Sequence, residues 1–338
     1  MVILGIESTA HTASMAIVDA EGNVRAIASD VYKPPSGGIH PREAANHHAE
    51  AFPELLARLV SEGHLHPEEV EAVAFSRGPG LGPCLRSGAT VARMLSLRWN
   101  RPLIPVNHCV AHIEIARLLS GMTDPVLLYA SGGNTQIIAY AHGRYRVLGE
   151  TLDMGVGNFL DKLAIALGGT FPGGPLIEQW ARQGEPTVEL PYSVHGMDVS
   201  FSGLYTAAKV AFRNGARRED LARSVEETAY SMLCETLERA VAHLGRHEVV
   251  LGGGVAANQR LRGMVERMAT PRGVRSFAPP PKLCVDNGAM IAWTGYLVWR
   301  TGGAVPVEES LVDPRQRTDQ VDARWRTPPP GARSPDVR

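Results

Sequence analysis

The sequence predicts an α/β protein built from two similar halves with a ligand site between them. Three observations support this: a strand–turn–strand pattern that occurs twice, helical segments with periodic apolar residues, and glycine-rich turns that join strands to helices. The 338 residues suffice for two lobes that each bury a core. We expect an N-terminal lobe at 1–120, a C-terminal lobe at 121–326 whose final helix is a candidate to return to the first lobe, and a disordered tail at 327–338.

The strand–turn–strand pattern is the first observation. A strand, a polar turn and a second strand are predicted at Val2–Ile6, Glu7–Thr12 and Ala13–Asp19, and again at Val126–Ala130, Ser131–Thr135 and Gln136–Tyr140. The two units start 124 residues apart. Turns rich in Ser, Thr and Gly can present backbone N–H groups to phosphate oxygens. One such hairpin in each half, with a nucleotide held between them, is the architecture of actin, hexokinase and Hsp70, although many other α/β folds also contain strand–turn–strand units.

Helices fill the intervals between the predicted strands. Residues 42–63 are expected to form two helices, with Pro53 as the start of the second. Apolar residues recur at helical spacing from Ser87 to Asn100 and, over the greatest length, from Leu221 to Leu244. These apolar faces indicate core packing.

Composition limits the classes of function. The formal net charge is -1, which gives no support for strong unaided binding to nucleic acid. None of the four cysteines forms a C-x-x-C pair, so neither a zinc ribbon nor a disulfide framework is indicated. The start of the chain lacks the pattern of a signal peptide, and no apolar run is long enough to span a bilayer. We therefore expect a cytoplasmic protein without membrane segments.

Two histidines four residues apart are a candidate metal site. His108 and His112 would lie on one face of a helix, where both rings can reach one ion, although such pairs also arise by coincidence. A zinc protease would need Glu at the position of Cys109 or of Ala111. Glu114 lies beyond the second histidine and can take neither position, so peptide hydrolysis is disfavoured.

Glycine-rich turns suit a nucleotide. They occur at Ser131–Thr135, Gly168–Pro175 and Gly252–Asn258, where glycine allows close approach of the backbone to a ligand. The sequence has neither the P-loop nor the G-x-G-x-x-G pattern, which excludes the common nucleotide folds that carry them. Asp161 is predicted at the start of a helix, where it would act as a cap or contact a ribose or substrate hydroxyl.

Five stretches in one order carry a specific family resemblance. They are Ser76–Arg86, Asn107–His112, Ser131–Gln136, Gly252–Asn258 and Asp286–Met290. Together they resemble the TsaD/OSGEP family of tRNA threonylcarbamoyltransferases, and the resemblance extends to Arg317. It implies the duplicated actin/Hsp70/sugar-kinase-like (ASKHA) fold, with nucleotide and metal between the lobes.

The resemblance also implies a site. One divalent ion, Fe(II) or Zn(II), would be bound by His108, His112, Tyr129 and Asp286. The adenine nucleotide, threonylcarbamoyl-AMP or ATP, would contact a set of turn and helix residues. That set is Tyr129, Ala130, Ser131, Gly132, Gly133, Asp161, Gly174, Glu178 and Asn258. The threonylcarbamoyl group would pass to N6 of adenosine 37 in tRNAs that read ANN codons. Glu7, His11 and Asp153 are candidates for a general base, each with an alternative structural role.

The segment Gly37–His48 resembles the archaeal and eukaryotic branch of the family. That branch works in the KEOPS complex beside a small atypical protein kinase and small accessory subunits, and in some archaeal members the kinase is fused at the C-terminus. Because this chain stops at Arg338, we expect the kinase to be a separate protein and tRNA to be the substrate. His40, His47 and His48 could form another metal cluster, but a helix start on a partner-facing surface is the simpler interpretation.

Two other classes of function remain open from the residues. The first is an ATPase or phosphotransferase of the same fold, which would not need the His/His/Tyr/Asp set. The second is a non-catalytic nucleotide-binding scaffold, in which a metal site would have no purpose. Tight retention of a metal would argue against both.

Overall fold

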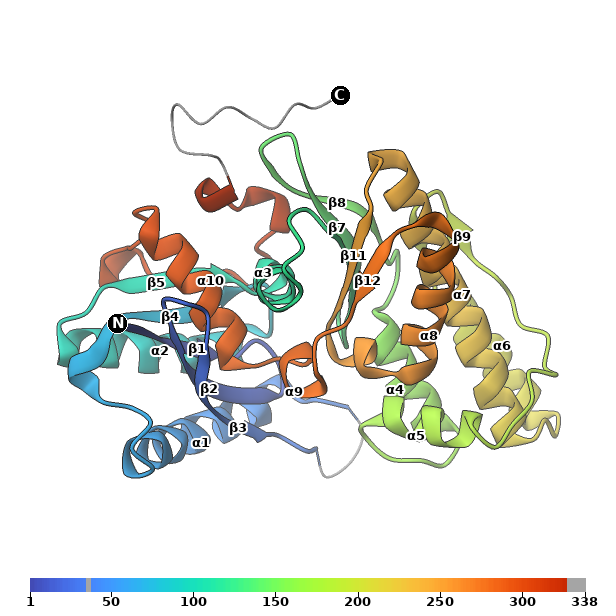
Figure 1. Ribbon diagram of the computed structural model, residues 1–338. Coiled ribbons are helices and arrows are strands. Elements are labelled where there is room, and N and C mark those ends of the chain that lie inside the picture. Colours follow the sequence, from blue (N-terminus) through green and yellow to red (C-terminus); the bar gives the residue numbers. More distant parts are fainter. Residues whose placement is uncertain (35–37, 327–338) are drawn as a thin grey trace.

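Two five-stranded mixed sheets, each covered by helices, lie side by side in the computed structural model, which describes residues 1–34 and 38–326 (Figure 1). The first sheet contains β1 (Val2–Glu7), β2 (Thr12–Asp19), β3 (Val24–Val31), β4 (Val70–Gly78) and β5 (Leu103–Asn107). The second contains β6 (Val126–Ala130), β7 (Thr135–Ala141), β8 (Arg144–Glu150), β11 (Glu248–Gly252) and β12 (Arg275–Phe277). Gly37 and the predicted tail at 327–338 lie outside the described residues.

The two sheets have the same topology, which confirms the duplication predicted from the repeated hairpin. Their strand orders are β3-β2-β1-β4-β5 and β12-β11-β6-β7-β8, so β1 and β6 occupy equivalent central positions. In each sheet the central strand pairs antiparallel with the next strand of its hairpin and parallel with a strand that arrives after a helical crossover. Central strands buried on both faces are expected to be apolar along their whole length, and β1 and β6 are fully buried.

Helices α1 (Pro41–Ser61) and α2 (Gly82–Trp99) cover one face of the first sheet. The structure corrects the prediction of two helices here, because α1 continues through Pro53. Proline inside a helix removes one backbone hydrogen bond. The buried side of α1 nevertheless presents Phe52, Leu55 and Leu59 to the core on either side of the proline, and this tertiary packing outweighs the local preference.

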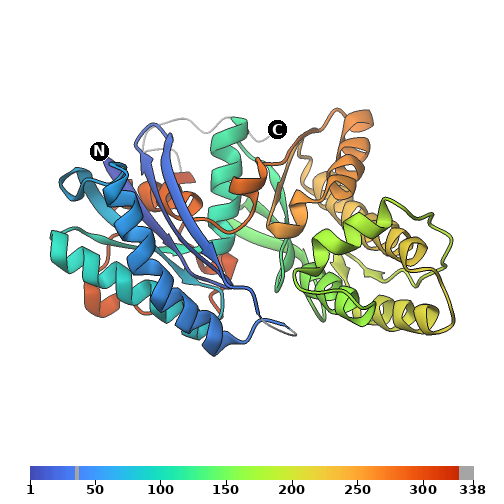
Figure 2. The same cartoon turned by 90° about the horizontal axis from the view of Figure 1, so that it is seen from below.

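The opposite face of the first sheet is covered by α3 (His108–Ser120) and α10 (Gly288–Arg300). Helix α3 lies between the two sheets: Ala111 and Ile115 pack with the first sheet, whereas Val110 and Ile113 pack with the second. In Figure 2, α3 stands between the N-terminal half of the chain and the helices of the second half. A helix enclosed in this way is expected to be apolar on nearly every side, so the buried side chains of His108, His112 and Glu114 are exceptions.

The other helices of the second half pack on the outer face of the second sheet. They are α4 (Val156–Ala166), α5 (Gly173–Ala181), α6 (Ser202–Arg213), α7 (Arg218–Leu244) and α8 (Gln259–Ala269). Smaller elements are the strands β9 (Val194–His195) and β10 (Asp198–Val199), the short helix α9 (Pro281–Cys284), and single 3-10 turns at Pro67–Glu69, Gly254–Ala257, Thr270–Arg272, Val307–Glu309, Thr318–Gln320 and Arg324–Arg326.

After β12 the chain crosses back to the first sheet. Helix α10 packs so closely on β1 that a Cβ atom at Gly5 would lie 2.2 Å from the carbonyl oxygen of Gly288. The following segment crosses back toward the second sheet, where Trp325 packs, and Trp325 also donates a hydrogen bond of 2.8 Å to Glu114 of α3. None of the helices in residues 1–34 and 38–326 combines the length and apolar character needed to cross a bilayer.

Candidate metal centre and nucleotide site

The two histidines of α3 are buried side by side. Helix α3 begins at His108 because the Asn107 side chain caps it by accepting a 3.0 Å hydrogen bond from the Val110 amide. His112 follows one turn later, and the two ring centroids lie 4.8 Å apart. The side chains are 3% and 1% exposed, so both rings are held inside the protein rather than on its surface.

Tyr129 and Asp286 complete the cluster from two other parts of the chain. The Tyr129 hydroxyl, near the end of β6, lies 3.0 Å from His108 Nε2. Asp286 precedes α10, and its Oδ1 lies 3.4 Å from His108 Nε2 and 3.3 Å from His112 Nε2. Within the described residues, His108, His112 and Asp286 are the one group of His, Cys, Asp or Glu side chains close enough to share an ion. His40, His47 and His48 do not form a second.

Three of the distances that join these ligand atoms fit a small divalent ion, and the His108, His112 and Asp286 atoms all lie within 4.8 Å of one another. Tetrahedral ligands at bond lengths of about 2.0 to 2.2 Å lie about 3.3 to 3.6 Å from one another. The observed separations of 3.0, 3.3 and 3.4 Å are close to that range. Two imidazole nitrogens and two oxygens form a set that suits Fe(II) or Zn(II) better than Mg(II) or Ca(II).

Glu7 orients His108 through Nδ1, the ring nitrogen that faces away from the cluster. Its Oε2 accepts a 2.9 Å hydrogen bond from His108 Nδ1, which directs the lone pair of Nε2 toward the cluster. Its Oε1 accepts hydrogen bonds from the amide and hydroxyl of Thr9 at 2.6 and 2.5 Å. Because Glu7 is fully buried and both its oxygens are engaged, this arrangement favours a positioning role over that of a general base.

The cluster is electrically polarised. Burial disfavours the charged ring of His108, but Tyr129, Glu7 and Asp286 outweigh burial and raise its pKa well above the usual value. Burial lowers the pKa of His112. Burial also opposes the carboxylate of Asp286, but the two histidines hold its pKa well below the usual value. A metal ion must therefore displace a proton from His108, and its affinity falls as the pH falls.

The other two candidate bases have different surroundings. Asp153 accepts hydrogen bonds from the amides of Phe201 and Ser202 at 3.0 and 2.8 Å, so its carboxylate anchors the start of α6. His11, at the tip of the β1–β2 hairpin, packs edge-on against Phe171 of the second half with centroids 5.8 Å apart. Its ring forms no hydrogen bond with another described residue, which leaves both of its nitrogens available.

The glycine hairpin that follows Tyr129 is fixed to the start of α4. The amides of Gly157 and Asn158 donate to the carbonyls of Ser131 and Gly132 at 3.0 and 2.9 Å. A Cβ atom at Gly157 would lie 2.7 Å from the Cα of Gly132, so glycine is required for this contact. Gly132 and Gly133 remain exposed, and their backbone is accessible to a ligand.

Asp161 corrects one prediction. It lies in the middle of α4 rather than at its start, and its Oδ1 accepts a 2.6 Å hydrogen bond from the amide of Gly173. The carboxylate therefore caps α5, and burial raises its pKa. The next residue, Gly174, faces open space, since an added Cβ atom would meet nothing within 4 Å.

Glu178 and Asn258 lie close together where α5 meets α8. Glu178 Oε1 lies 3.3 Å from the amide of Gln259. Asn258 caps α8 through its Oδ1 and donates from Nδ2 to Glu226 at 2.7 Å. Sequence analysis missed Glu226, a buried acid whose pKa is raised by burial. The signal was an acid inside the apolar helix predicted for Leu221–Leu244, and it becomes informative only once its partner Asn258 is known.

The sequence matches the family described as tRNA N6-adenosine threonylcarbamoyltransferase, TsaD, over residues 23–293. The tRNA N6-adenosine threonylcarbamoyltransferase of Thermococcus kodakarensis is 52% identical, over 96% of this chain and 100% of that protein. The "probable bifunctional tRNA threonylcarbamoyladenosine biosynthesis protein" of Methanothermobacter thermautotrophicus is also 52% identical. The match covers 96% of this chain but 61% of that longer protein.

Distant solved structures share the fold. HypF of T. kodakarensis superposes with a TM-score of 0.63 at 14% identity, over 89% of this chain and 48% of HypF. The activator of the 2-hydroxyisocaproyl-CoA dehydratase from Clostridium difficile superposes with a TM-score of 0.53 at 12% identity, over 88% of this chain and 94% of the activator. These matches agree with the duplicated ASKHA-type fold.

Proposed function

This chain belongs to the TsaD family of tRNA N6-adenosine threonylcarbamoyltransferases, and we propose that it performs the transfer at a metal centre formed by His108, His112, Tyr129 and Asp286. The protein is a transferase that forms N6-threonylcarbamoyladenosine in tRNA. We further propose that the acceptor is adenosine 37 and that the donor is threonylcarbamoyl-AMP.

The observation that carries the proposal is the convergence of four ligand atoms from three segments of the chain. Their separations suit an ion, and Glu7 orients one of the histidines. A divalent ion bound there would supply Lewis-acid polarisation to an oxygen of the threonylcarbamoyl group. The residues themselves would fix the position of that group beside the exposed glycine hairpin.

We assign the nucleotide to the surface formed by the hairpin and the starts of α5 and α8. The exposed backbone at Gly132 and Gly133 suits phosphate oxygens, and the open face of Gly174 leaves room for a flat base or a ribose. Glu178 offers a carboxylate to ribose hydroxyls. His11, at the boundary between the two halves, is the candidate base whose ring nitrogens form no hydrogen bond to the described part of the chain.

The geometry does not support the hypothesis that this chain is a zinc protease. Cys109 and Ala111 are buried and cannot act as the general base that zinc proteases require. The nearby Glu114 has its carboxylate bound by Tyr145, Arg117 and Trp325. An ATPase or phosphotransferase of the same fold is the remaining rival, and it gives no reason for the buried histidine pair.

We propose that the chain works in the cytoplasm, within a KEOPS-type complex that contains a small atypical kinase and small accessory subunits. An exposed apolar groove of about 500 Å³ between α1 and α2 supports a protein partner. It is lined by Phe52, Leu56, Val60, Val91 and Met94, among others. Helix α1 also contains most of the segment 37–48, on which the resemblance to the archaeal and eukaryotic branch of the family rests.

Replacement of His112 by Ala tests the metal centre. We expect the folded variant to lose most of its bound metal and its transfer of threonine to unmodified tRNA, because one of four ligands is removed. His66→Ala, which changes an exposed histidine outside both the cluster and the segment 37–48, serves as control and should keep both. Full metal occupancy in His112→Ala would refute the assignment.

A further inference from the structure

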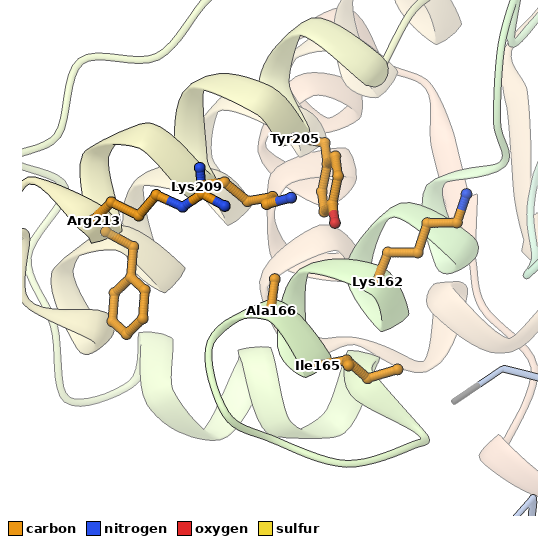
Figure 3. A pocket seen from close by; sticks show the side chains of 7 residues that line it. Lys162, Ile165, Ala166, Tyr205, Lys209 and Arg213 are labelled. Carbon is orange, nitrogen blue, oxygen red and sulfur yellow. The ribbon is translucent and has the colours of Figure 1, made fainter. Parts of the chain in front are cut away.

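Three cations from two helices meet in a cleft that no sequence pattern indicated. Lys162 of α4 and Lys209 and Arg213 of α6 line an open cleft of about 360 Å³, together with Tyr205 and Phe212 (Figure 3). The net charge gave no support for strong binding to nucleic acid, but it did not exclude a local basic patch. The sequence could not indicate this one, because the two helices are separated along the chain and approach only when α4 and α6 pack together.

Helical geometry gives α6 one basic face. Tyr205, Lys209 and Arg213 are spaced four residues apart, so they lie on the same side of the helix. The Lys209 ammonium lies 5.0 Å from the centre of the Tyr205 ring, which holds it over an aromatic face. In Figure 3 the end of the Lys209 side chain lies beside the Tyr205 ring, and Lys162 extends from the neighbouring helix on the other side of Tyr205.

The charges of this cleft are not neutralised. Among the described residues, no carboxylate lies within 4.0 Å of Lys162, Lys209 or Arg213. Their neighbours on the chain behave differently, because Arg217 and Arg218 both form ion pairs with Glu219. Three cations around one cleft, unpaired within residues 1–34 and 38–326, create a local positive potential on a chain whose net charge is -1.

The cleft lies close to the candidate nucleotide site. Helix α4 begins against the glycine hairpin, and Lys162 follows Val156 by six residues, which is about 9 Å along the helix axis. Lys162 also directly follows Asp161, which caps α5 beside Gly174. A polyanion bound in the cleft would therefore extend toward the residues that we assign to transfer.

We propose that this cleft between α4 and α6 binds backbone phosphates of the tRNA substrate, next to the adenosine that is modified. The proposal rests on the transferase activity, whose substrate is a polyanion that must reach the site. Phosphates are bound by cations without regard to base identity, which fits a surface that contacts many tRNAs. The open shape of the cleft suits a chain that passes through it.

The test compares two triple variants that remove equal charge. Lys162→Ala/Lys209→Ala/Arg213→Ala removes the cleft cations. Arg58→Ala/Arg98→Ala/Arg300→Ala removes three arginines, also without a carboxylate within 4.0 Å among the described residues, from helices of the first half. Binding of fluorescent unmodified tRNA by the full chain is measured from about 50 to 200 mM salt. Metal content and AMP binding are measured on the same samples.

We expect the cleft variant to bind tRNA about tenfold more weakly, and the slope of log affinity against log salt to fall by about 2, near 0.7 for each lost contact. The KM for tRNA should rise while kcat stays unchanged. The control variant should match the unmodified chain. Equal affinity in all three proteins, or an equal loss in both variants, would overturn the proposal. If the unmodified chain binds neither metal nor AMP, the proposed metal and nucleotide site is overturned instead.

Discussion

At the scale of single residues, Glu7 shows how burial changes the meaning of an acid. From the sequence it was one of three candidates for a general base, with a structural role as the alternative. In the structure its oxygens bind His108 and Thr9. Removing the charge of Glu7 should therefore weaken the binding of metal by His108.

We expect Glu7→Gln to lower metal affinity about 10- to 100-fold, because the amide weakens the hydrogen bond that orients and polarises His108. Competition with a chelator of known affinity measures the change. Glu43→Gln, an exposed position that contacts Tyr32, is the control. If Glu7→Gln holds metal as tightly as the control, Glu7 does not position the ligand.

The individual site residues also differ in whether the sequence could predict them. The four-residue spacing of His108 and His112 is local information, and it indicated a shared face. Tyr129 and Asp286 came only from the family resemblance, since 174 residues separate Asp286 from His112. No periodicity covers such a distance. Glu226 was missed because a buried acid in an apolar helix becomes informative only when its partner, Asn258, is known.

At the scale of elements, distant side chains determine where helices begin. Asp161 caps α5 from the middle of α4, and Asp153 anchors α6 from the loop before α4. The sequence predicted the helices at Ser87–Asn100 and Leu221–Leu244, but it assigned Asp161 to the start of its own helix, because capping rules read only adjacent residues. Pro53 was misread for a related reason: the local rule favours a helix start, and tertiary packing overrides it.

Asp153→Ala should destabilise the protein by about 1 kcal/mol at neutral pH, a modest value because the carboxylate is exposed. Although burial opposes it, hydrogen bonds from Phe201 and Ser202 lower the pKa of Asp153 below its ordinary value of 3.8. The carboxylate therefore contributes full stability above about pH 4, and the contribution disappears as pH falls through the folded-state pKa.

Urea unfolding of both proteins between pH 7 and pH 3 measures this difference. We expect the two free energies of unfolding to converge at acidic pH. A difference that does not depend on pH would show that the charge of Asp153 is unimportant to α6.

Gly174→Trp tests the start of α5. Its Cβ direction is open, so the fold should tolerate the substitution while the indole occupies the space assigned to the nucleotide. We expect adenine nucleotide affinity to fall at least about tenfold by calorimetry. Gly203→Trp, at another open glycine, should bind normally. Unchanged affinity in folded Gly174→Trp would exclude this position from the site.

At the scale of the whole molecule, the duplication was predictable because it leaves a repeated local pattern. The hairpins at Val2 and Val126 became the equivalent strands β1 and β6. The return of the final helix to the first lobe was an expectation, and α10 packs on the first sheet, but no repeated local pattern marks the crossing itself. The basic cleft was invisible for the same reason, since it exists only after α4 and α6 meet.

We expect the isolated chain to bind metal and nucleotide but to modify tRNA slowly, because three cations in one cleft hold a tRNA weakly at physiological salt. Addition of the kinase-like neighbour and the accessory subunits should raise turnover by orders of magnitude. Incorporation of labelled threonine, with bicarbonate, ATP and the synthase that makes the adenylate, measures the rate. Equal rates with and without the partners would disprove this dependence.

The packing of α10 on β1 has a consequence for biosynthesis. The first strands to leave the ribosome cannot bury their second face until Gly288 and Ala292 have been made. At about 5 to 20 residues per second, the nascent chain keeps that apolar surface uncovered for about 15 to 60 s. Such an interval exposes the growing chain to aggregation, so we expect efficient production to depend on chaperones that shield β1 and β2 until synthesis is complete.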